Sequence, residues 1–376
     1  MLVLIEGRQM SNRISITGSA LERNKKHQEI AEKYNLTLDQ IINLSLGDNL
    51  FIPPSLIQEL VVKNIESIDP RNSYPTDYYT FLDEISRFIG VENQSLYPGL
   101  THNQLVQRAL STITKPEDNV ILINPDKDIF SNIIQSQKLK INKVSLLDNF
   151  ELDVNAILEQ IEVCSAKAII FTSPHYPTAN QFQENDVLTL AKETKIPIII
   201  DESYVEFGKY SLVNQVKFFD NLVIVRSFSK AWGLGSLSCA YLVADSKIVN
   251  LLKDKYFIEE IPPIHAIATK HILQSPYKFV ELINTFNLEK RRVQDQLKML
   301  SGLKVFKSDT NFLFIRYKKD IKELYEQLCS KGIIVQTFDE TNEFKDYNHF
   351  FVATLGDSKI NDKLVLAVIE ALEALS

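Results

Sequence analysis

Cysteine and long apolar runs are both scarce in this sequence of 376 residues. The cysteines are Cys164, Cys239 and Cys329. Their wide spacing provides neither a disulfide framework nor a zinc-binding pattern. Apolar runs such as Ile198–Ile200 are far shorter than the roughly 20 residues of a membrane-spanning helix. Residues 1–10 are interrupted by Glu6 and Arg8 and are too short for a signal-peptide core. We therefore expect a cytoplasmic protein that does not contact a membrane.

The sequence also lacks an excess of positive charge. Its 41 Lys and Arg residues and 48 Asp and Glu residues give a net charge of −7, whereas nucleic-acid binders carry a basic surface. Its six histidines show no metal-ligand spacing, so we expect neither a nucleic acid nor a metal as partner. Apolar residues make up 45% of the chain, which excludes disorder for most of it. Only 11 glycines occur, so a glycine beside a motif is informative.

The middle of the chain alternates short apolar runs with segments of helical period. The runs are residues 120–123, 168–171, 196–200, 222–225 and 240–243. Each run is too short for a helix and apolar on both faces, as expected for a buried parallel strand. Residues 184–194 and 246–256 have helical periodicity. This alternation predicts an α/β fold, a three-layer α/β/α domain around a mostly parallel sheet.

The C-terminal part of the chain has a different pattern, which predicts a second, smaller α+β domain. Residues 311–317 and 332–338 resemble strands, and residues 361–375 resemble an amphipathic closing helix. The N-terminal segment is too short to stand alone, and we expect it to pack on this small domain. The predicted division is residues 1–55 for this segment, 56–270 for the large domain and 271–376 for the small domain.

The strongest chemical signal is a lysine between two serines, directly after a predicted strand. Ser227, Ser229 and Lys230 follow the run at 222–225. Ligands of open α/β sheets bind beyond the carboxyl ends of the strands. A lysine there suits covalent attachment of an aldehyde cofactor, and the serine hydroxyls and backbone N–H groups suit a phosphate. The alternative is a surface lysine in an ordinary loop.

A second signal is an aspartate at the end of the preceding strand. Asp201 follows the run at 196–200, and Tyr204 lies three residues later. A buried carboxylate is costly unless it meets a cation, and a protonated pyridine nitrogen is such a cation. Tyr204 is placed to donate a hydrogen bond to the phenolate oxygen of the same ring. The alternative is that Asp201 only caps the following turn.

Two further segments are candidates for the site, and the first of them ends at the same predicted edge of the sheet. Residues 172–178 follow the run at 168–171. Residues 98–102 precede a helical stretch, whose N-terminal N–H groups would form an anion site beside Leu100 and Thr101. The alternative for Thr101 is an ordinary helix cap.

Together these motifs resemble the fold-type I pyridoxal-phosphate enzymes. The series Ser-x-Ser-Lys-Ala-aromatic-Gly-Leu at 227–234 and Asp-Glu-Ser-Tyr-Val-Glu-Phe at 201–207 are most similar to the class I/II aminotransferases, in particular the histidinol-phosphate aminotransferase branch. The resemblance covers nearly the whole chain. It includes the Tyr-Pro segment at 72–75, Ser-x-x-Asn-Phe at 308–312, and the closing residues Gly356, Asn361 and Asp362.

The resemblance implies pyridoxal 5′-phosphate as cofactor and a role for each matching residue. Lys230 would be the Schiff-base lysine and proton carrier, Asp201 would pair with the pyridine nitrogen, and Tyr204 would bind the phenolate oxygen. Phe130 would stack on the ring. The residues implied around the phosphate are Ser227, Ser229, the backbone N–H groups of Leu100 and Thr101, and Tyr74 of the partner subunit. The resemblance thus implies a homodimer with shared active sites. It would also bring His102 and His175 near the cofactor, whereas each alone reads as a surface or capping histidine.

The sequence departs from the family pattern at several functional positions. Tyr176 occupies the place of the cofactor-facing asparagine of Asn-Pro-Thr-Gly, and Ala179 replaces its glycine. Ser238 occupies the position at which the family has an arginine that binds the phosphate. A serine there supplies at best one neutral hydrogen bond. Val352, four residues before Gly356, replaces the arginine that receives the substrate carboxylate. Gln336 replaces another small-domain arginine.

These departures predict an aminotransferase with an unusual amino donor, a small-molecule amine or amino compound. Another cation would otherwise have to bind a carboxylate, and Arg316, Lys127 and Arg108 are the nominal candidates. Two alternatives remain open. The scaffold could carry a different pyridoxal-phosphate reaction, such as that of a decarboxylase, lyase or oxidase, or the chain could be a degenerate member that only binds a ligand.

Overall fold

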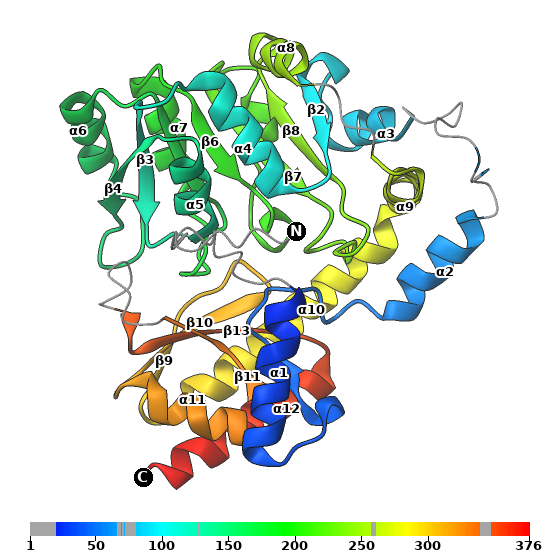
Figure 1. Cartoon of the computed structure of the whole chain (residues 1–376), viewed down its shortest axis with the longest axis vertical. Helices are drawn as coiled ribbons and strands as arrows, with labels where there is room; N and C mark the ends of the chain where they lie inside the picture. Colours follow the sequence, from blue (N-terminus) through cyan, green and yellow to red (C-terminus); the bar gives the residue numbers. More distant parts are fainter. Residues whose placement is uncertain are drawn as a thin grey trace, which may run out of the picture.

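The computed structural model describes residues 20–65, 69, 71, 80–126, 128–256, 261–338 and 347–376. Figure 1 shows a larger α/β lobe stacked on a smaller α+β lobe, with the long helix α10 (Pro276–Lys298) at their junction. Four short 3-10 helices also occur in these ranges: η1 (Leu38–Gln40), η2 (Asn93–Ser95), η3 (Val205–Phe207) and η4 (Val213–Gln215). None of the helices in the described ranges combines the length and hydropathy needed to cross a bilayer.

The large lobe is built on a seven-stranded sheet of order β2-β8-β7-β6-β5-β3-β4. Its strands are β2 (Leu96–Gly99), β3 (Asn119–Asn124), β4 (Lys140–Ser145), β5 (Ala168–Thr172), β6 (Ile198–Asp201), β7 (Leu222–Ser227) and β8 (Ala240–Ala244). All five predicted apolar runs are confirmed as strands. Neighbouring strands from β7 to β4 are parallel, so the prediction of a mostly parallel sheet is confirmed.

The expectation that residues 240–243 form a parallel strand is wrong. β8 pairs antiparallel with both β2 and β7. The physical reason lies in the connection at 228–239, which contains no helix. A parallel neighbour needs a long crossover, usually helical, whereas a chain that turns back directly pairs antiparallel.

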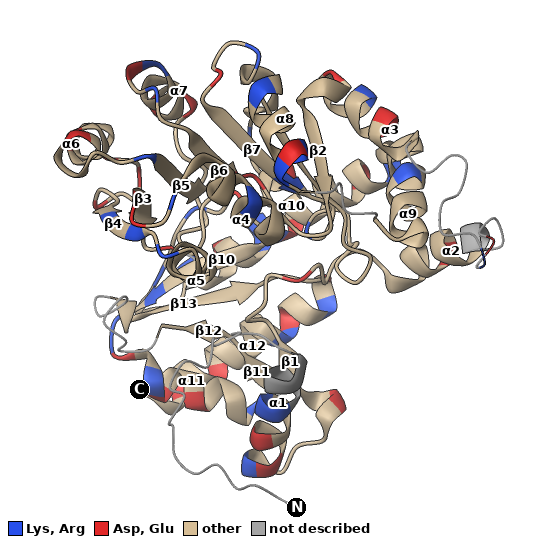
Figure 2. Ribbon diagram, turned by 45° about the horizontal axis from the view of Figure 1, so that its top comes forward, with Lys and Arg blue, Asp and Glu red and all other residues tan. Residues whose placement is uncertain are grey.

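Helices cover both faces of the sheet, and alternate strand residues enter separate cores. In β6, Ile199 faces the core that contains α4 (His102–Ile113), α5 (Asp128–Ser136) and α8 (Ser246–Lys255). Ile198 and Ile200 face the opposite core, with α6 (Val154–Cys164) and α7 (Glu184–Glu193). All three isoleucines are fully buried, each contributing about 1.5–3 kcal/mol. Figure 2 shows most charged residues on the surrounding helices and loops.

The small lobe contains a four-stranded antiparallel sheet of order β12-β13-β10-β9. Its elements are β9 (Leu303–Val305), β10 (Phe312–Tyr317), α11 (Ile321–Ser330), β11 (Ile333–Ile334), β12 (Gln336–Thr337), β13 (Phe350–Thr354) and α12 (Ser358–Ala374). The predicted strand at 332–338 is divided: β11 and β12 belong to different sheets. The predicted closing helix begins earlier, at Ser358, because Asp357 caps it by accepting a hydrogen bond from the N–H of Ile360.

The N-terminal segment contacts the small lobe. α1 (Ala20–Tyr34) packs on α11, where Lys33 and Tyr34 both hydrogen-bond to Glu326. β1 (Ile42–Asn43) pairs in parallel with β11. On the right of Figure 1, α9 (Pro263–Gln274) packs against α2 (Pro54–Ile65) and α3 (Thr80–Ile89). The exact domain boundaries at residues 55 and 270 stay predictions.

Candidate cofactor site

The predicted functional residues of the large lobe meet at one edge of its sheet, where the parallel strands β5, β6 and β7 end. Thr172 pairs in register with Asp201, and Asp201 pairs with Val225, two residues before the end of β7 at Ser227. β2 ends at this edge as well, because Gly99 and Ser227 both pair with Ala240 of the intervening β8. At about 4.8 Å per strand, the Leu100 and Ser227 segments are about 10 Å apart.

Asp201 supplies a fully buried carboxyl group at this edge. Its Oδ1 accepts hydrogen bonds from the backbone N–H of Ser203, at 2.9 Å, and from the Ser203 hydroxyl. Its Oδ2 lies 4.0 Å from Nε2 of His102, the first residue of α4. These contacts orient the carboxyl group. His102 therefore lies beside Asp201, and its place near a cofactor stays a prediction.

Lys230 lies in the loop after β7, under a segment from the N-terminal part of the chain. Its Nζ donates a hydrogen bond to the backbone carbonyl of Leu46, at 3.3 Å. The same segment contacts the lysine backbone as well, because Nδ2 of Asn49 donates a hydrogen bond to the carbonyl of Lys230, at 2.7 Å. The Nζ atom also lies 5.8 Å from the centre of the Tyr204 ring. The lysine is half-buried, so it is ordered by these contacts without being a core residue.

Tyr204 follows β6 and is buried beside Lys230. Burial raises the pKa of its hydroxyl well above the ordinary value, and the nearby groups of Tyr176, Asp201 and Asp48 raise this pKa further. The hydroxyl therefore stays protonated and serves as a hydrogen-bond donor. Phe312 of the small lobe packs edge-on against both Tyr204 and Tyr176, with ring centres 5.3 and 5.6 Å apart.

The residues expected around a phosphate form local contacts at the same edge. The Thr101 hydroxyl caps α4 by accepting from the N–H of Gln104, at 3.2 Å, so the capping alternative is also correct. The N–H of Leu100 donates to the side chain of Gln104. Ser227 Oγ accepts from the N–H of Ser229 at 3.1 Å. The Ser238 hydroxyl donates to the carbonyl of Gly235.

Other predicted residues lie elsewhere. Phe130 is buried in the core between the sheet and α4, α5 and α8, so its stacking role stays a prediction. Of the candidate cations, Arg108 donates to the Tyr97 hydroxyl and Arg316 is exposed beside Phe350. Tyr74 and Lys127 lie outside the described residues. Val352 is buried and pairs in register with Gln336. Both residues lie in the small lobe, where the sequence predicts them.

A strap formed by Leu46–Asn49 completes the site, and sequence reasoning missed it. Nδ2 of Asn311 donates to the carbonyls of Gly47 and Asp48, at 3.2 and 3.0 Å. The N–H of Gly47 donates to Oγ1 of Thr354, at 2.9 Å. The small lobe therefore holds the strap against Lys230. The available signal was Gly47 itself, a glycine followed by Asp48 and Asn49 in a chain with few glycines.

Gly47 provides a direct test of this strap. Its φ is +62°, and a Cβ there would lie 2.8 Å from the Tyr204 hydroxyl and 3.6 Å from Lys230 Nζ. We expect Gly47→Ala to cost about 1 kcal/mol in unfolding free energy and also to impair cofactor attachment. The control is Gly90→Ala, whose φ is +71° but whose Cβ would meet only Asn214, at 4.0 Å. Urea unfolding and cofactor absorbance should separate the two; equal cofactor attachment in both variants would contradict the role of the strap.

A buried ionic cluster contacts the loop that carries Lys230. Nη2 of Arg226 donates to Oε1 of Glu206 at 2.6 Å, and the same oxygen accepts from the indole N–H of Trp232 at 3.0 Å. Glu202 is nearby, and its carboxylate accepts hydrogen bonds from Ser211 Oγ at 2.6 Å and from the N–H of Leu212 at 2.7 Å. Burial raises the pKa of Glu202 from 4.5 to about 7, although Arg226 opposes the shift.

The pKa of Glu202 predicts a pH-dependent contribution to stability. Between pH 4.5 and about 7 the folded protein keeps the Glu202 proton and the unfolded chain releases it. This contribution is therefore complete below pH 4.5 and is lost as the pH rises through about 7. We expect the wild type to lose more unfolding free energy than Glu202→Gln between about pH 5 and about pH 8, because glutamine does not titrate. Equal losses in urea unfolding of the cofactor-free proteins would show that Glu202 is already ionised in the fold.

The arrangement fits a cofactor with a basic ring nitrogen, a phenolate oxygen, an aldehyde and a phosphate. Asp201 is a buried carboxyl group that would pair with a protonated ring nitrogen, Tyr204 is a buried hydroxyl that would donate to the phenolate oxygen, and Lys230 is an amine held beside Tyr204. The N-terminus of α4 and the Ser227 segment provide N–H and hydroxyl donors for the phosphate. The weak point of the fit is Ser238, which brings no positive charge to the phosphate side.

Comparisons with known proteins identify the family to which the chain is similar. The family model for aminotransferase class I and II matches residues 39–354. The chain is 28% identical over 328 residues to the histidinol-phosphate aminotransferase of Ruminiclostridium cellulolyticum, which covers 85% of this chain and 90% of the relative. It is 25% identical over 335 residues to the enzyme of that name from Clostridium novyi, covering 89% of this chain and 91% of the relative.

Solved structures share the fold. Histidinol-phosphate aminotransferase from Sinorhizobium meliloti in complex with pyridoxal-5′-phosphate superimposes with a TM-score of 0.83 at 15% identity, covering 93% of this chain and 95% of the other. The L-threonine-O-3-phosphate decarboxylase from Porphyromonas gingivalis superimposes with a TM-score of 0.73 at 19% identity, covering 89% of this chain and 100% of the other.

Proposed function

Because the chain belongs to the aminotransferase class I and II family, a family of pyridoxal-phosphate enzymes, we propose that it is an aminotransferase with an unusual amino donor. The proposal is carried by the combination of three retained groups, a lysine, an aspartate and a tyrosine, with an apolar residue at the carboxylate position. Lys230, Asp201 and Tyr204 meet at one sheet edge, while Val352 has no group that binds an anion.

Each residue has a chemical task in this proposal. Pyridoxal phosphate, when bound, supplies an aldehyde that carries the amino group and a ring that withdraws electrons. The Lys230 amine holds the aldehyde carbon and then moves a proton to and from the substrate Cα. Asp201 keeps the proton on the ring nitrogen. Tyr204 donates to the phenolate oxygen, because its raised pKa keeps it protonated. The Leu46–Asn49 strap orients Lys230 through the Leu46 carbonyl.

The test is a single half-reaction with purified protein. Protein loaded with pyridoxal phosphate is mixed with a panel of amines and amino acids, without any amino acceptor. An aminotransferase produces one carbonyl product and one pyridoxamine phosphate per site, detected by mass spectrometry and by the change in visible absorbance. Carbon dioxide release or multiple turnovers without an acceptor would indicate a decarboxylase or lyase instead. Oxygen consumption would indicate an oxidase, and no cofactor band at all would leave a non-catalytic binder.

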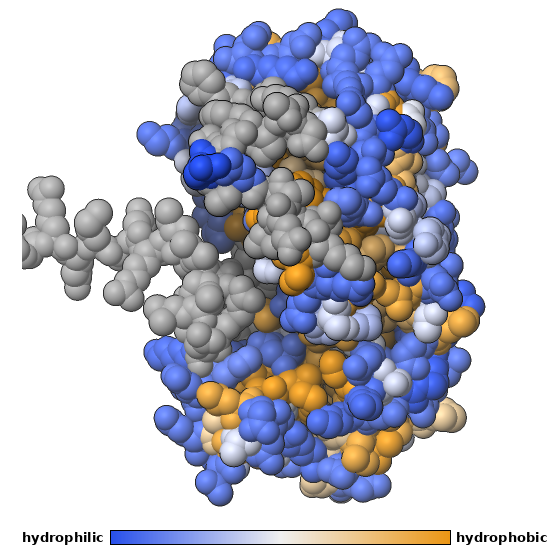
Figure 3. Space-filling model, turned by 90° about the vertical axis from the view of Figure 1, so that its right-hand side faces the viewer, coloured by the Kyte–Doolittle hydropathy of each residue, from blue (hydrophilic) through white to orange (hydrophobic). Residues whose placement is uncertain are grey.

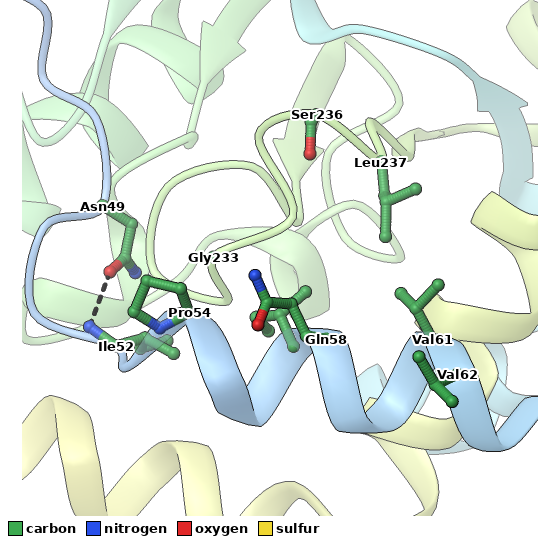
Figure 4. Close-up of a pocket in the computed structure, with 10 residues that line it drawn as sticks. Asn49, Ile52, Pro54, Gln58, Val61, Val62, Gly233, Ser236 and Leu237 are labelled. Atoms are coloured by element: carbon green, nitrogen blue, oxygen red, sulfur yellow. Dashed lines mark hydrogen bonds between the residues drawn. The ribbon is translucent and has the colours of Figure 1, made fainter.

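We also propose a homodimer with shared active sites, in which Tyr74 reaches the phosphate of the neighbouring site. A groove of about 450 Å³ supports this, because it lies between α2 and the loop that follows Lys230 (Figure 4). Apolar side chains of Ile52, Ile57 and Val61 line it. Figure 3 shows the face with α2 and α9, where apolar side chains are exposed among polar ones.

The three free thiols, at Cys164, Cys239 and Cys329, fit a reducing cytoplasm.

The dimer proposal predicts an effect of charge at Val62, which lines the groove and is 64% exposed. We expect Val62→Asp to weaken self-association at least about tenfold, because an aspartate at the centre of an interface must be desolvated. The control is Val163→Asp on α6, since Val163 is 72% exposed but lies on an outer helix of the large lobe. Sedimentation velocity measures both. Equal sedimentation of the two variants and the wild type would contradict this interface.

A further inference from the structure

Glu206 lies two residues after Tyr204, in the short helix η3 that follows β6. This turn is closed by the N–H of Phe207, which donates to the Tyr204 carbonyl at 3.0 Å. The start of the turn is fixed to the sheet, because the N–H of Glu202 donates to the carbonyl of Val225 in β7, at 2.8 Å. The Glu206 side chain is only 11% exposed. Its carboxylate therefore has a defined position relative to Tyr204.

The Glu206 carboxylate accepts hydrogen bonds from the neighbouring strand and from the lysine loop, both at Oε1. Nη2 of Arg226, near the end of β7, donates at 2.6 Å, and the indole N–H of Trp232 donates at 3.0 Å. Trp232 lies two residues after Lys230 in the same loop. Among the residues that the structure describes, Oε2 has no hydrogen-bond partner. A single oxygen atom thus joins the turn after β6 to β7 and to the lysine loop.

The loop that carries Lys230 is held at two points by these contacts. The strap provides the first, since Nδ2 of Asn49 donates to the Lys230 carbonyl at 2.7 Å. Glu206 provides the second through Trp232. The Nζ atom of Lys230 lies 5.8 Å from the centre of the Tyr204 ring. The two groups that the proposed reaction uses are therefore connected through the buried Glu206 carboxylate.

Both donors to Glu206 are buried, so the contacts are hard to replace. Arg226 is 7% exposed and Trp232 is 2% exposed. A buried donor that loses its acceptor is costly, and the bond from Arg226 is also charge-assisted. Such fixed geometry matters in catalysis, because a displacement of about 1 Å at a reacting group can lower a rate about 100-fold.

We propose that Glu206 is a positioning residue: through Trp232 it holds the Lys230 amine in a fixed place relative to the Tyr204 hydroxyl, so that both groups meet the same cofactor. This rests on the proposed aminotransferase function, in which Lys230 moves the proton and Tyr204 donates to the phenolate oxygen. Glu206 acts through geometry, whereas its charge stabilises the buried Arg226. Substitution can separate the two contributions.

Glu206→Ala and Glu206→Gln form a matched pair. Both remove the charge beside Arg226, so both should lower the unfolding free energy. Glutamine keeps an acceptor oxygen for Trp232 and Arg226, and its amide nitrogen takes the place of Oε2, which makes no hydrogen bond with the described residues. Alanine keeps no acceptor. An effect that appears in Glu206→Ala and is absent from Glu206→Gln therefore reports position and not charge.

The first measurement uses cofactor-free protein and the fluorescence of Trp232, the only tryptophan in the sequence. In Glu206→Ala the emission should shift to longer wavelength and be quenched by acrylamide at least about twofold more strongly, because the loop has lost a hydrogen bond. The wild type and Glu206→Gln should behave alike. Glu202→Gln is the control, since its carboxylate accepts from Ser211 and Leu212. It should also match the wild type.

The second measurement is a pH titration of the visible band in protein loaded with pyridoxal phosphate. A hydroxyl that donates to the phenolate oxygen makes the nearby lysine-bound nitrogen less basic. If Lys230 and Tyr204 lose their alignment, the pH midpoint of the band should rise, by about 0.5–1 unit in Glu206→Ala. The midpoint should stay at the wild-type value in Glu206→Gln and in Glu202→Gln.

Trp232→Phe provides a second variant in case Glu206→Ala does not fold. It removes the indole N–H but keeps an aromatic ring beside Phe228 and Phe88, whose ring centres lie 5.9 and 5.5 Å from that of Trp232. The pH midpoint should rise in this variant as well, while Glu206 and Arg226 remain paired. An unchanged midpoint in folded Trp232→Phe overturns the inference.

The remaining outcomes are equally decisive. Equal midpoint shifts in Glu206→Ala and Glu206→Gln would show that charge acts and not position, which overturns the inference. Wild-type fluorescence in Glu206→Ala would show that Glu206 does not hold the loop. A wild-type protein without the visible band removes the proposed function itself, whereas a band whose midpoint is the same in all variants overturns only the role of Glu206.

Discussion

Replacing Lys230 by alanine is expected to abolish the visible absorbance band of the lysine-bound cofactor and to lower turnover by about 10⁴-fold or more. In the proposed function the amine is both the covalent attachment point and the group that moves the proton, and the substitution removes these two roles together. Its position supports both roles, since its Nζ lies between the Leu46 carbonyl, at 3.3 Å, and the Tyr204 ring. Absorbance spectra and single-turnover rates measure the loss.

The fold should survive this substitution, because Lys230 is half-buried and no core cluster depends on it. Lys217→Ala is the matched control, since Lys217 is exposed and contacts only the neighbouring Phe218 ring among the contacts described for it. The control should keep the band and full turnover. Adding a small primary amine should restore part of the turnover of Lys230→Ala by replacing the proton carrier. A Lys230→Ala protein that keeps the band would remove the cofactor assignment.

The strands at whose ends the site lies were predictable, because their sequences fit neither a helix nor a loop. Runs such as 168–171 and 222–225 are too short for helices and too apolar for loops, and each leads into polar residues. Since the ends of parallel strands share an edge, the meeting of Asp201 with Ser227 followed from sequence order. The direction of β8 did not follow, because an apolar run looks the same whether the strand is parallel or antiparallel to its neighbour. The helix-free connection at 228–239 decides the antiparallel direction.

The strap over Lys230 could not be predicted, because its partners are distant in sequence. Leu46 contacts Lys230, and Gly47 contacts Thr354, across separations of 184 and 307 residues. Periodicity reports which face of an element is buried and does not report what covers it. The same limit applies to Val352: its spacing from Gly356 identified the position, but only the structure shows that it is buried and pairs with Phe314 of β10.

The resemblance implied that His102 lies near the cofactor, and the structure adds that its ring lies 4.0 Å from Asp201. Thr101 and His102 begin α4, and a cap followed by a histidine is common at a helix start. The antiparallel β8 brings β2, and with it the start of α4, to the edge where Asp201 lies.

Asp201→Asn is expected to lower turnover by about 10²- to 10⁴-fold while leaving the cofactor attached to Lys230. The side chains have nearly the same shape, and the asparagine oxygen can still accept from the N–H and hydroxyl of Ser203, as Oδ1 does at 2.9 Å from that N–H. The negative charge is lost, so the protonated ring nitrogen loses its buried partner. Breaking such a pair costs about 3–5 kcal/mol, which corresponds to the expected range of rates.

The adjacent carboxyl group supplies the control that makes this prediction specific. Glu202 is buried like Asp201, but its oxygens accept from Ser211 and Leu212, away from the sheet edge. Glu202→Gln should therefore change the pH dependence of stability and leave turnover within a few-fold of the wild type. Asp201→Glu, which keeps the charge at the wrong distance, should lie between wild type and Asp201→Asn. If Asp201→Asn instead retained turnover within tenfold, the chemistry at this edge would not require a protonated ring nitrogen, and electron withdrawal would have to come from the phenolate side, where the family resemblance would place Tyr204 and Tyr176.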